Sequence, residues 1–129
     1  MPIELAMVLR LLLAAALGAI IGYQRERAGK AAGLRTHILI SVGAALFTVA
    51  SYGFGAAADP SRIAAGVVAG IGFIGAGAIM RTGEGFVAGL TTAATIWAVA
   101  GIGLAAGAGL YLISAVTTVL VLIVLFLPH

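Results

Sequence analysis

The sequence has 129 residues, of which 63% are hydrophobic and 9% are charged, and its mean hydropathy is +1.23. A soluble domain carries about 25% charged residues, so this chain cannot cover a globular surface with polar groups and we expect an integral membrane protein. Membrane topology explains the net charge of +3 better than nucleic acid binding does, and the absence of cysteine excludes disulfides and thiolate metal sites.

Five apolar segments follow one another along the chain, and each can cross a bilayer as a helix. We expect spans at residues 3–23, 36–54, 62–80, 87–106 and 110–127. Together they predict a single all-α transmembrane domain over residues 1–129, a compact bundle of about five helices with no C-terminal soluble domain. In the first span, Gly18 and Gly22 form a G-x-x-x-G pair, which indicates a close helix contact.

The connection at residues 24–35 is strongly charged and forms the first candidate site. Glu26, with arginines beside it at the mouth of the bundle, could bind an anion, a lipid head group or a partner. The alternative is a topology signal in contact with lipid phosphates. We also expect Arg35 to hold the second helix to this loop through Glu26 or helix-end carbonyls. The candidate residues are Gln24, Arg25, Glu26, Arg35, Thr36 and His37.

The second span carries a polar stripe made of His37, Ser41, Thr48 and Tyr52 at helical spacing. One interpretation is a hydrophilic path for an ion. The other is that the hydroxyls simply join helices, with each bond contributing about 0.6 kcal/mol.

The third span begins at a clear helix start, with Asp59 as the N-cap, followed by a proline, and Arg62 in the first turn. Five glycines follow, on two opposed faces of the helix. Because small residues let helix backbones approach closely, we expect this helix to be clamped from both sides at the centre of the bundle. One face holds Gly66, Gly70 and Gly77, and the other holds Gly72 and Gly75.

Residues 70–75 match the pattern G-x-G-x-x-G of dinucleotide-binding sites. Such a site needs a preceding strand, a following helix and an acidic residue about 20 positions on. Here the glycines lie inside an apolar span and no acidic residue stands near position 90. We therefore interpret the match as a coincidence of helix packing.

In the fourth span, Thr91, Thr92 and Thr95 are candidates for helix packing. Trp97 lies in the middle of this span, away from the interfaces where tryptophan is enriched, so we expect it to pack against a glycine face or a partner subunit. A second polar patch, at residues 111–118, lies on the fifth span.

The distribution of basic residues predicts the orientation. The first and third connections carry five of them, whereas the opposite side carries Arg62 and at most Arg10. The positive-inside rule then places the N-terminus outside and the C-terminus in the cytoplasm.

Acidic residues are few, and Glu4, Asp59 and Glu84 flank the spans. We find no paired carboxylates, catalytic triad or metal-ligand spacing, so we predict that the protein is not an enzyme. A conventional Mg²⁺ channel would need carboxylates, carbonyls and retained water, and this chain offers mainly hydroxyls.

Four stretches resemble the MgtC/SapB family of bacterial inner-membrane proteins in sequence, order and spacing. They are residues 33–36 (GLRT), 62–65 (RIAA), 70–77 (GIGFIGAG) and 89–97 (GLTTAATIW). The resemblance covers nearly the whole chain. It implies a multi-pass protein of the bacterial inner membrane, linked to adaptation to low Mg²⁺ and, in pathogens, to survival inside host cells.

The resemblance also implies a regulatory role on other membrane proteins, such as the ATP synthase. Many members carry a cytoplasmic C-terminal domain. The family usually has Glu at the position of Gln24 and often has Gln at the position of Gly66.

Two hypotheses follow. The first is a non-enzymatic regulator that forms a homo-oligomer, most simply a dimer, packed through its glycine faces in the lipid bilayer. The second is a transporter of Mg²⁺ or another small ion along the polar helix faces. No cofactor is certain, although Mg²⁺ is a candidate ligand.

Overall fold

The computed structural model describes residues 2–81 and 87–128 of the chain. Within them it contains five α-helices, one 3-10 helix (η1) and one pair of two-residue antiparallel strands. The elements are α1 Ile3–Arg27, α2 Leu34–Ser51, η1 Tyr52–Ala57, α3 Pro60–Gly77, β1 Met80–Arg81, β2 Val87–Ala88, α4 Leu90–Gly107 and α5 Tyr111–Leu125. The predicted helical bundle is confirmed.

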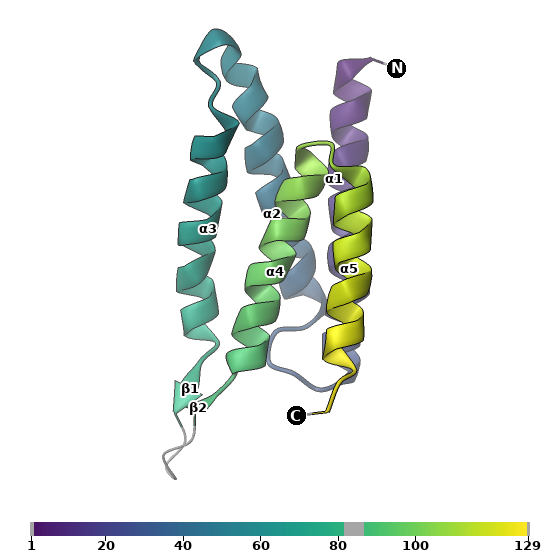
Figure 1. Cartoon of the computed structure of the whole chain (residues 1–129), viewed down its shortest axis with the longest axis vertical. Helices are drawn as coiled ribbons and strands as arrows, with labels where there is room; N and C mark the ends of the chain where they lie inside the picture. Colours follow the sequence, from purple (N-terminus) through teal and green to yellow (C-terminus); the bar gives the residue numbers. More distant parts are fainter. Residues whose placement is uncertain (1, 82–86, 129) are drawn as a thin grey trace.

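Four helical segments have the length and apolarity to cross a membrane: α1, α2 together with η1, α3, and α4. Helix α5 is apolar but has only 15 residues. The N- and C-termini lie at opposite ends of the bundle, as an odd number of passes requires (Figure 1). Which end faces the cytoplasm stays a prediction.

The central helix is α4, which contacts the other four helices. It buries nine residues, and Ile96, Val99 and Ile102 form the middle of the apolar core. Helix α3 lies at the edge of the bundle (Figure 1), where it packs chiefly on α4 and buries only Ile71 and Gly75. The expectation that α3 is the central helix was therefore wrong.

Most glycines of α3 face open space within the single chain. A Cβ placed at Gly66, Gly70, Gly72 or Gly77 would meet no other part of the chain within 4 Å, whereas Gly75 faces Ala93 of α4. The expected clamp on both faces is absent from one protomer because glycine spacing shows where a close approach is permitted, not where it occurs. A contact with a second copy stays a prediction.

Close glycine packing occurs instead around α2. A Cβ at Gly18 of α1 would lie 2.7 Å from the carbonyl oxygen of His37, and one at Gly107 of α4 would lie 2.7 Å from that of Ala45. Gly22 and Gly103 make the same kind of backbone contact with α2. Glycines thus hold α2 between α1 and α4, and the close contact that the Gly18–Gly22 pair predicts is confirmed.

Several helix boundaries differ from the prediction. Helix α1 continues to Arg27, so residues 24–27 are helical rather than part of a loop. Helix α3 ends at Gly77 and α4 begins only at Leu90. Gly89 lies between β2 and α4. Its φ of 88° is a left-handed backbone conformation that favours glycine. The predicted turn at residues 81–85 lies mostly outside the described residues.

Replacing Gly103 by alanine tests the backbone contact between α4 and α2. The new methyl group would overlap the Ser41 backbone, and we expect a loss of about 2 kcal/mol in unfolding free energy from overpacking. Gly101→Ala is the matched control, since it adds the same methyl group two residues away into open space. Denaturing-detergent titrations of both variants measure the difference, and equal stabilities would contradict this packing.

Candidate functional site

Buried polar side chains gather where the C-terminal end of α1 meets the first turns of α2 and α4. We call Gln24, Arg25, His37 and Thr92 the polar cluster. Arg25 is buried because it continues the apolar face of α1 by one further turn, at the 3–4 residue spacing of a helix. The buried residues of that face are Ala14, Leu17, Gly18, Ile21, Gly22 and Arg25.

Arg25 joins α1 to α4. Its side chain is only 3% exposed, and Nη2 donates a hydrogen bond of 2.9 Å to Oγ1 of Thr92. The Nε–H of Arg25 is also buried and has no partner among the described residues. A buried donor without a partner costs about 1–3 kcal/mol, so the remaining bond to Thr92 matters for the position of this guanidinium.

His37 is fully buried in the first turn of α2. Its Nδ1 lies 2.9 Å from the carbonyl oxygen of Gly33. A carbonyl can only accept, so Nδ1 must carry a proton, and Nε2 of the neutral ring is then an acceptor. Nε2 has no partner among the described residues, and the same is true of Oε1 of Gln24. Among the described residues, the polar cluster therefore contains at least one fully buried donor and two fully buried acceptors without a partner.

Glu26 secures the connection between α1 and α2. Its Oε1 accepts a hydrogen bond of 3.2 Å from the backbone N–H of Leu34, the first residue of α2. This satisfies a free donor at the helix start, where negative charge is also favourable. Arg35 is exposed and forms no hydrogen bond within the described part of the chain. The expected anchoring role of Arg35 thus belongs to the Leu34 backbone, and Thr36 is only half-buried.

The polar stripe of α2 packs against helices. The Ser41 hydroxyl donates to the carbonyl oxygen of Ala14 in α1 at 2.7 Å, and the Thr48 hydroxyl donates to Ala44 at 2.8 Å. Ser41 and Thr48 are 0% and 3% exposed. The hydroxyls of Thr95 and Thr118 likewise bond to carbonyls of their own helices. Ser41 thus joins α2 to α1, whereas the other three hydroxyls are satisfied within their own helices.

One polar contact was not foreseen from the sequence. Arg10 of α1 donates 3.1 Å hydrogen bonds to the Tyr111 hydroxyl and to the carbonyl oxygen of Gly107, and its guanidinium lies over the Tyr111 ring. The signal for it is an arginine isolated within an apolar span, which needs a partner in the bundle. It ties α1 to the connection between α4 and α5.

At the opposite end of the molecule, Asp59 caps α3 as predicted. Its carboxylate accepts from the Arg62 backbone N–H at 3.3 Å and from the Ser61 hydroxyl at 2.7 Å. The bond from Ser61, followed by that from the Arg62 N–H, holds the pKa of Asp59 below its usual range. Asp59 and Arg62 therefore lie far along the bundle from the polar cluster, and the structure does not join them into one site.

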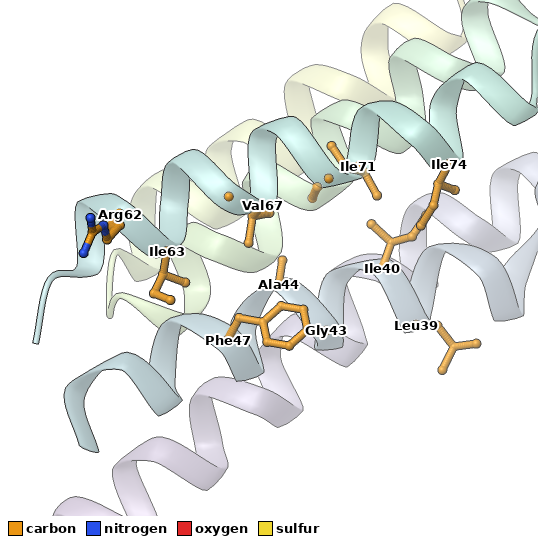
Figure 2. A pocket seen from close by; sticks show the side chains of 13 residues that line it. Leu39, Ile40, Gly43, Ala44, Phe47, Arg62, Ile63, Val67, Ile71 and Ile74 are labelled. Atoms are coloured by element: carbon orange, nitrogen blue, oxygen red, sulfur yellow. The ribbon is translucent and has the colours of Figure 1, made fainter. Parts of the chain in front are cut away.

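An apolar groove runs between α2 and α3 and has a volume of about 450 Å³. Figure 2 shows Ile63 and Val67 of α3 pointing toward α2, with Arg62 at the end where α3 begins. Ala100 of α4 also lines the groove. The other residues that line it include Leu39, Ile40, Gly43, Ala44, Phe47, Gly66, Gly70, Ile71 and Ile74. Trp97 lies outside this groove and is 60% exposed.

The described residues contain no group of three or more histidine, cysteine, aspartate or glutamate side chains that could hold a metal. The polar cluster offers a guanidinium and an imidazole, whereas Mg²⁺ needs carboxylate, carbonyl or water oxygens.

A family model described as the MgtC family matches residues 11–129. The chain is 48% identical over 130 residues to the putative magnesium transporter YhiD of Escherichia coli (strain K12), covering 95% of this chain and 60% of that protein. It is 49% identical over 109 residues to protein MgtC of Brucella abortus (strain 2308), covering 84% and 45%. It is 47% identical over 115 residues to protein MgtC of Salmonella typhimurium, covering 89% and 49%.

The chain therefore spans between 45% and 60% of the length of these relatives. No solved structure matches it. The match in sequence extends over the polar cluster, since Gln24, Arg25, His37 and Thr92 all lie inside the residues that the family model covers.

Removing the hydroxyl of Thr92 tests the bond from Arg25. Thr92→Val keeps the shape but leaves a second buried guanidinium donor without a partner, and we expect a loss of about 1–3 kcal/mol in unfolding free energy. Thr91→Val is the control, because Thr91 is exposed on the same helix turn. Denaturing-detergent unfolding measures both variants, and an unchanged Thr92→Val protein would disprove the contribution of this bond.

Replacing Glu26 by alanine tests the start of α2. The variant loses the acceptor for the Leu34 N–H, and we expect a loss of about 1 kcal/mol, as for a helix cap. Arg35→Ala changes an exposed side chain and should stay within about 0.5 kcal/mol of the wild type. Thermal unfolding in detergent compares them, and a larger loss for Arg35→Ala would restore the anchoring role first expected of that residue.

Proposed function

The chain belongs to the MgtC family, and from this premise we propose that it is a non-enzymatic regulator of other proteins in the bacterial inner membrane during adaptation to low Mg²⁺. The family and the candidate membrane-spanning helices place it as a multi-pass membrane protein of that compartment. Its partners are other membrane proteins, of which the ATP synthase is one candidate, and it acts as a homo-oligomer.

The observation that carries the proposal is the packing of the polar groups. The α2 hydroxyls, which would line an ion path, instead bond to backbone carbonyls and are almost fully buried. Hydroxyls that are bonded in this way are not free to coordinate a passing ion, whereas the long apolar surfaces of α3 and α5 are exposed and available for recognition. Regulation by contact needs such surfaces, whereas ion conduction needs groups that can replace a hydration shell.

The polar cluster suits a role in transmitting a signal between helices. It couples α1 to α4 at one end of the bundle through the bond from Arg25 to Thr92, and His37 bonds to the carbonyl oxygen of Gly33 at the start of α2. Around it lie exposed cationic side chains, Arg27, Lys30 and Arg35. A partner or a lipid phosphate that binds these cations would act on the helix ends that the cluster joins.

Transport of Mg²⁺ is the second candidate, favoured by the name of the relative in Escherichia coli, putative magnesium transporter YhiD. Because the polar stripe is packed within one protomer, a transport path in this case would run between copies of the chain. The exposed glycine face of α3 is the place where such copies could approach each other closely.

Flux through purified protein separates these functions. We expect liposomes that contain the protein and a Mg²⁺ indicator to take up no more Mg²⁺ than empty vesicles under an inward gradient. We also expect expression of the chain to restore growth at low Mg²⁺ in a bacterium that lacks its own family member. A Mg²⁺ influx above that of empty vesicles would establish transport and reject regulation as the primary function.

A further inference from the structure

The groove between α2 and α3 is apolar along its length and cationic at one end. Its walls consist of aliphatic, aromatic and glycine residues, and Arg62 is the one charged residue that lines it within the described part of the chain. Figure 2 shows Arg62 at the start of α3 and Ile74 near the other end. This is the pattern of polarity found in an amphiphile with one anionic head and a long hydrocarbon tail.

The length of the groove matches one leaflet of a bilayer. Twelve residues separate Arg62 from Ile74, which at about 1.5 Å per residue corresponds to about 18 Å. Half of a hydrocarbon core is about 15 Å thick. If Arg62 lies at the level of the lipid phosphates, the groove therefore ends near the middle of the membrane, where an acyl chain of that leaflet also ends.

The groove has a volume of about 450 Å³ and is lined almost entirely by apolar side chains. A helix with its side chains is at least about 10 Å across, so it could lie over the groove, whereas a flexible hydrocarbon chain can follow the groove along its length.

Glycines keep the groove open. Gly43 of α2 and Gly66 and Gly70 of α3 line it, and a Cβ at any of them would meet no other part of the chain within 4 Å. Larger side chains at these positions would occupy the groove themselves. The glycines therefore have a role here that differs from that of Gly18 and Gly107, which bring backbones together.

The charge at the head of the groove favours an anionic ligand. The guanidinium of Arg62 is exposed and stands at the N-terminus of α3, where the helix dipole also attracts negative charge. The nearby Asp59 carboxylate accepts from Ser61 and from the Arg62 backbone, and its negative charge partly offsets the attraction of Arg62 for an anion.

We propose that this groove binds an anionic phospholipid, with one acyl chain lying between α2 and α3 and the phosphate on Arg62. The bound lipid replaces the protein contacts that α3 lacks along α2, and it fixes the distance between these two helices. The site goes beyond the proposed regulatory function and does not depend on it, since lipid binding is measured on the purified protein.

Native mass spectrometry of the purified protein with added phosphatidylglycerol tests the acyl-chain site. Gly70→Leu fills the groove and should weaken binding on the order of tenfold, with Gly66→Leu as a second filling variant if the first is not monodisperse. Gly72→Leu is the matched control, because it adds the same side chain to an exposed position of α3 outside the groove. Equal lipid binding by the filling and control variants overturns the proposal.

Separate variants test the contact between Arg62 and the lipid head group. Arg62→Gln should weaken phosphatidylglycerol binding about fivefold and reduce its preference over phosphatidylethanolamine, whereas Lys30→Gln should not. Inorganic phosphate should not raise the melting temperature as phosphatidylglycerol does. A phosphate effect of equal size overturns the lipid as the ligand. A lipid-free dimer that Gly70→Leu dissociates would show that a second copy covers the groove, and it also overturns the proposal.

Discussion

The bundle depends on backbone contacts that α2 makes with α1 on one side and α4 on the other. At Gly18, Gly22, Gly103 and Gly107 a Cβ would meet atoms of α2 at 3 Å or less, so the helices approach as closely as their backbones permit. In a membrane, where lipid tails are as apolar as the side chains, such packing is a main source of helix association. The apolar core and the buried polar groups are placed by this three-helix unit.

The close packing also explains why polar groups can be buried. Once α1 and α2 touch, the Ser41 hydroxyl reaches the carbonyl oxygen of Ala14. The end of α1 likewise brings Arg25 onto Thr92 of α4. These bonds satisfy groups that would be costly in lipid, and they fix the rotation of each helix about its axis. The burial of the polar stripe of α2 is thus a consequence of helix packing.

Local patterns predicted much of this fold, because they act within one helix. The spans follow from apolar length, and the cap at Asp59 follows from residue type and the adjacent proline. The position of α3 could not be predicted, since two glycine faces permit close packing but do not determine which helix packs against them. The bond between Arg25 and Thr92 joins residues 67 apart in sequence, so it depends on how α1 and α4 are arranged. Arg25 was predicted as a candidate site residue because it is charged. Its burial could not be predicted, since it follows from the continuation of α1 beyond residue 23.

In this account α1, α2 and α4 form a rigid unit and α3 lies at its edge. Few buried contacts indicate a low local stability, and α3 buries only two residues. Pulsed electron paramagnetic resonance on the cysteine-free chain tests this directly, with spin labels on exposed positions. In detergent we expect a narrow distance distribution between positions 12 and 46, on α1 and α2, and a distinctly broader one between positions 46 and 68, on α2 and α3. Equal widths for the two pairs would contradict it.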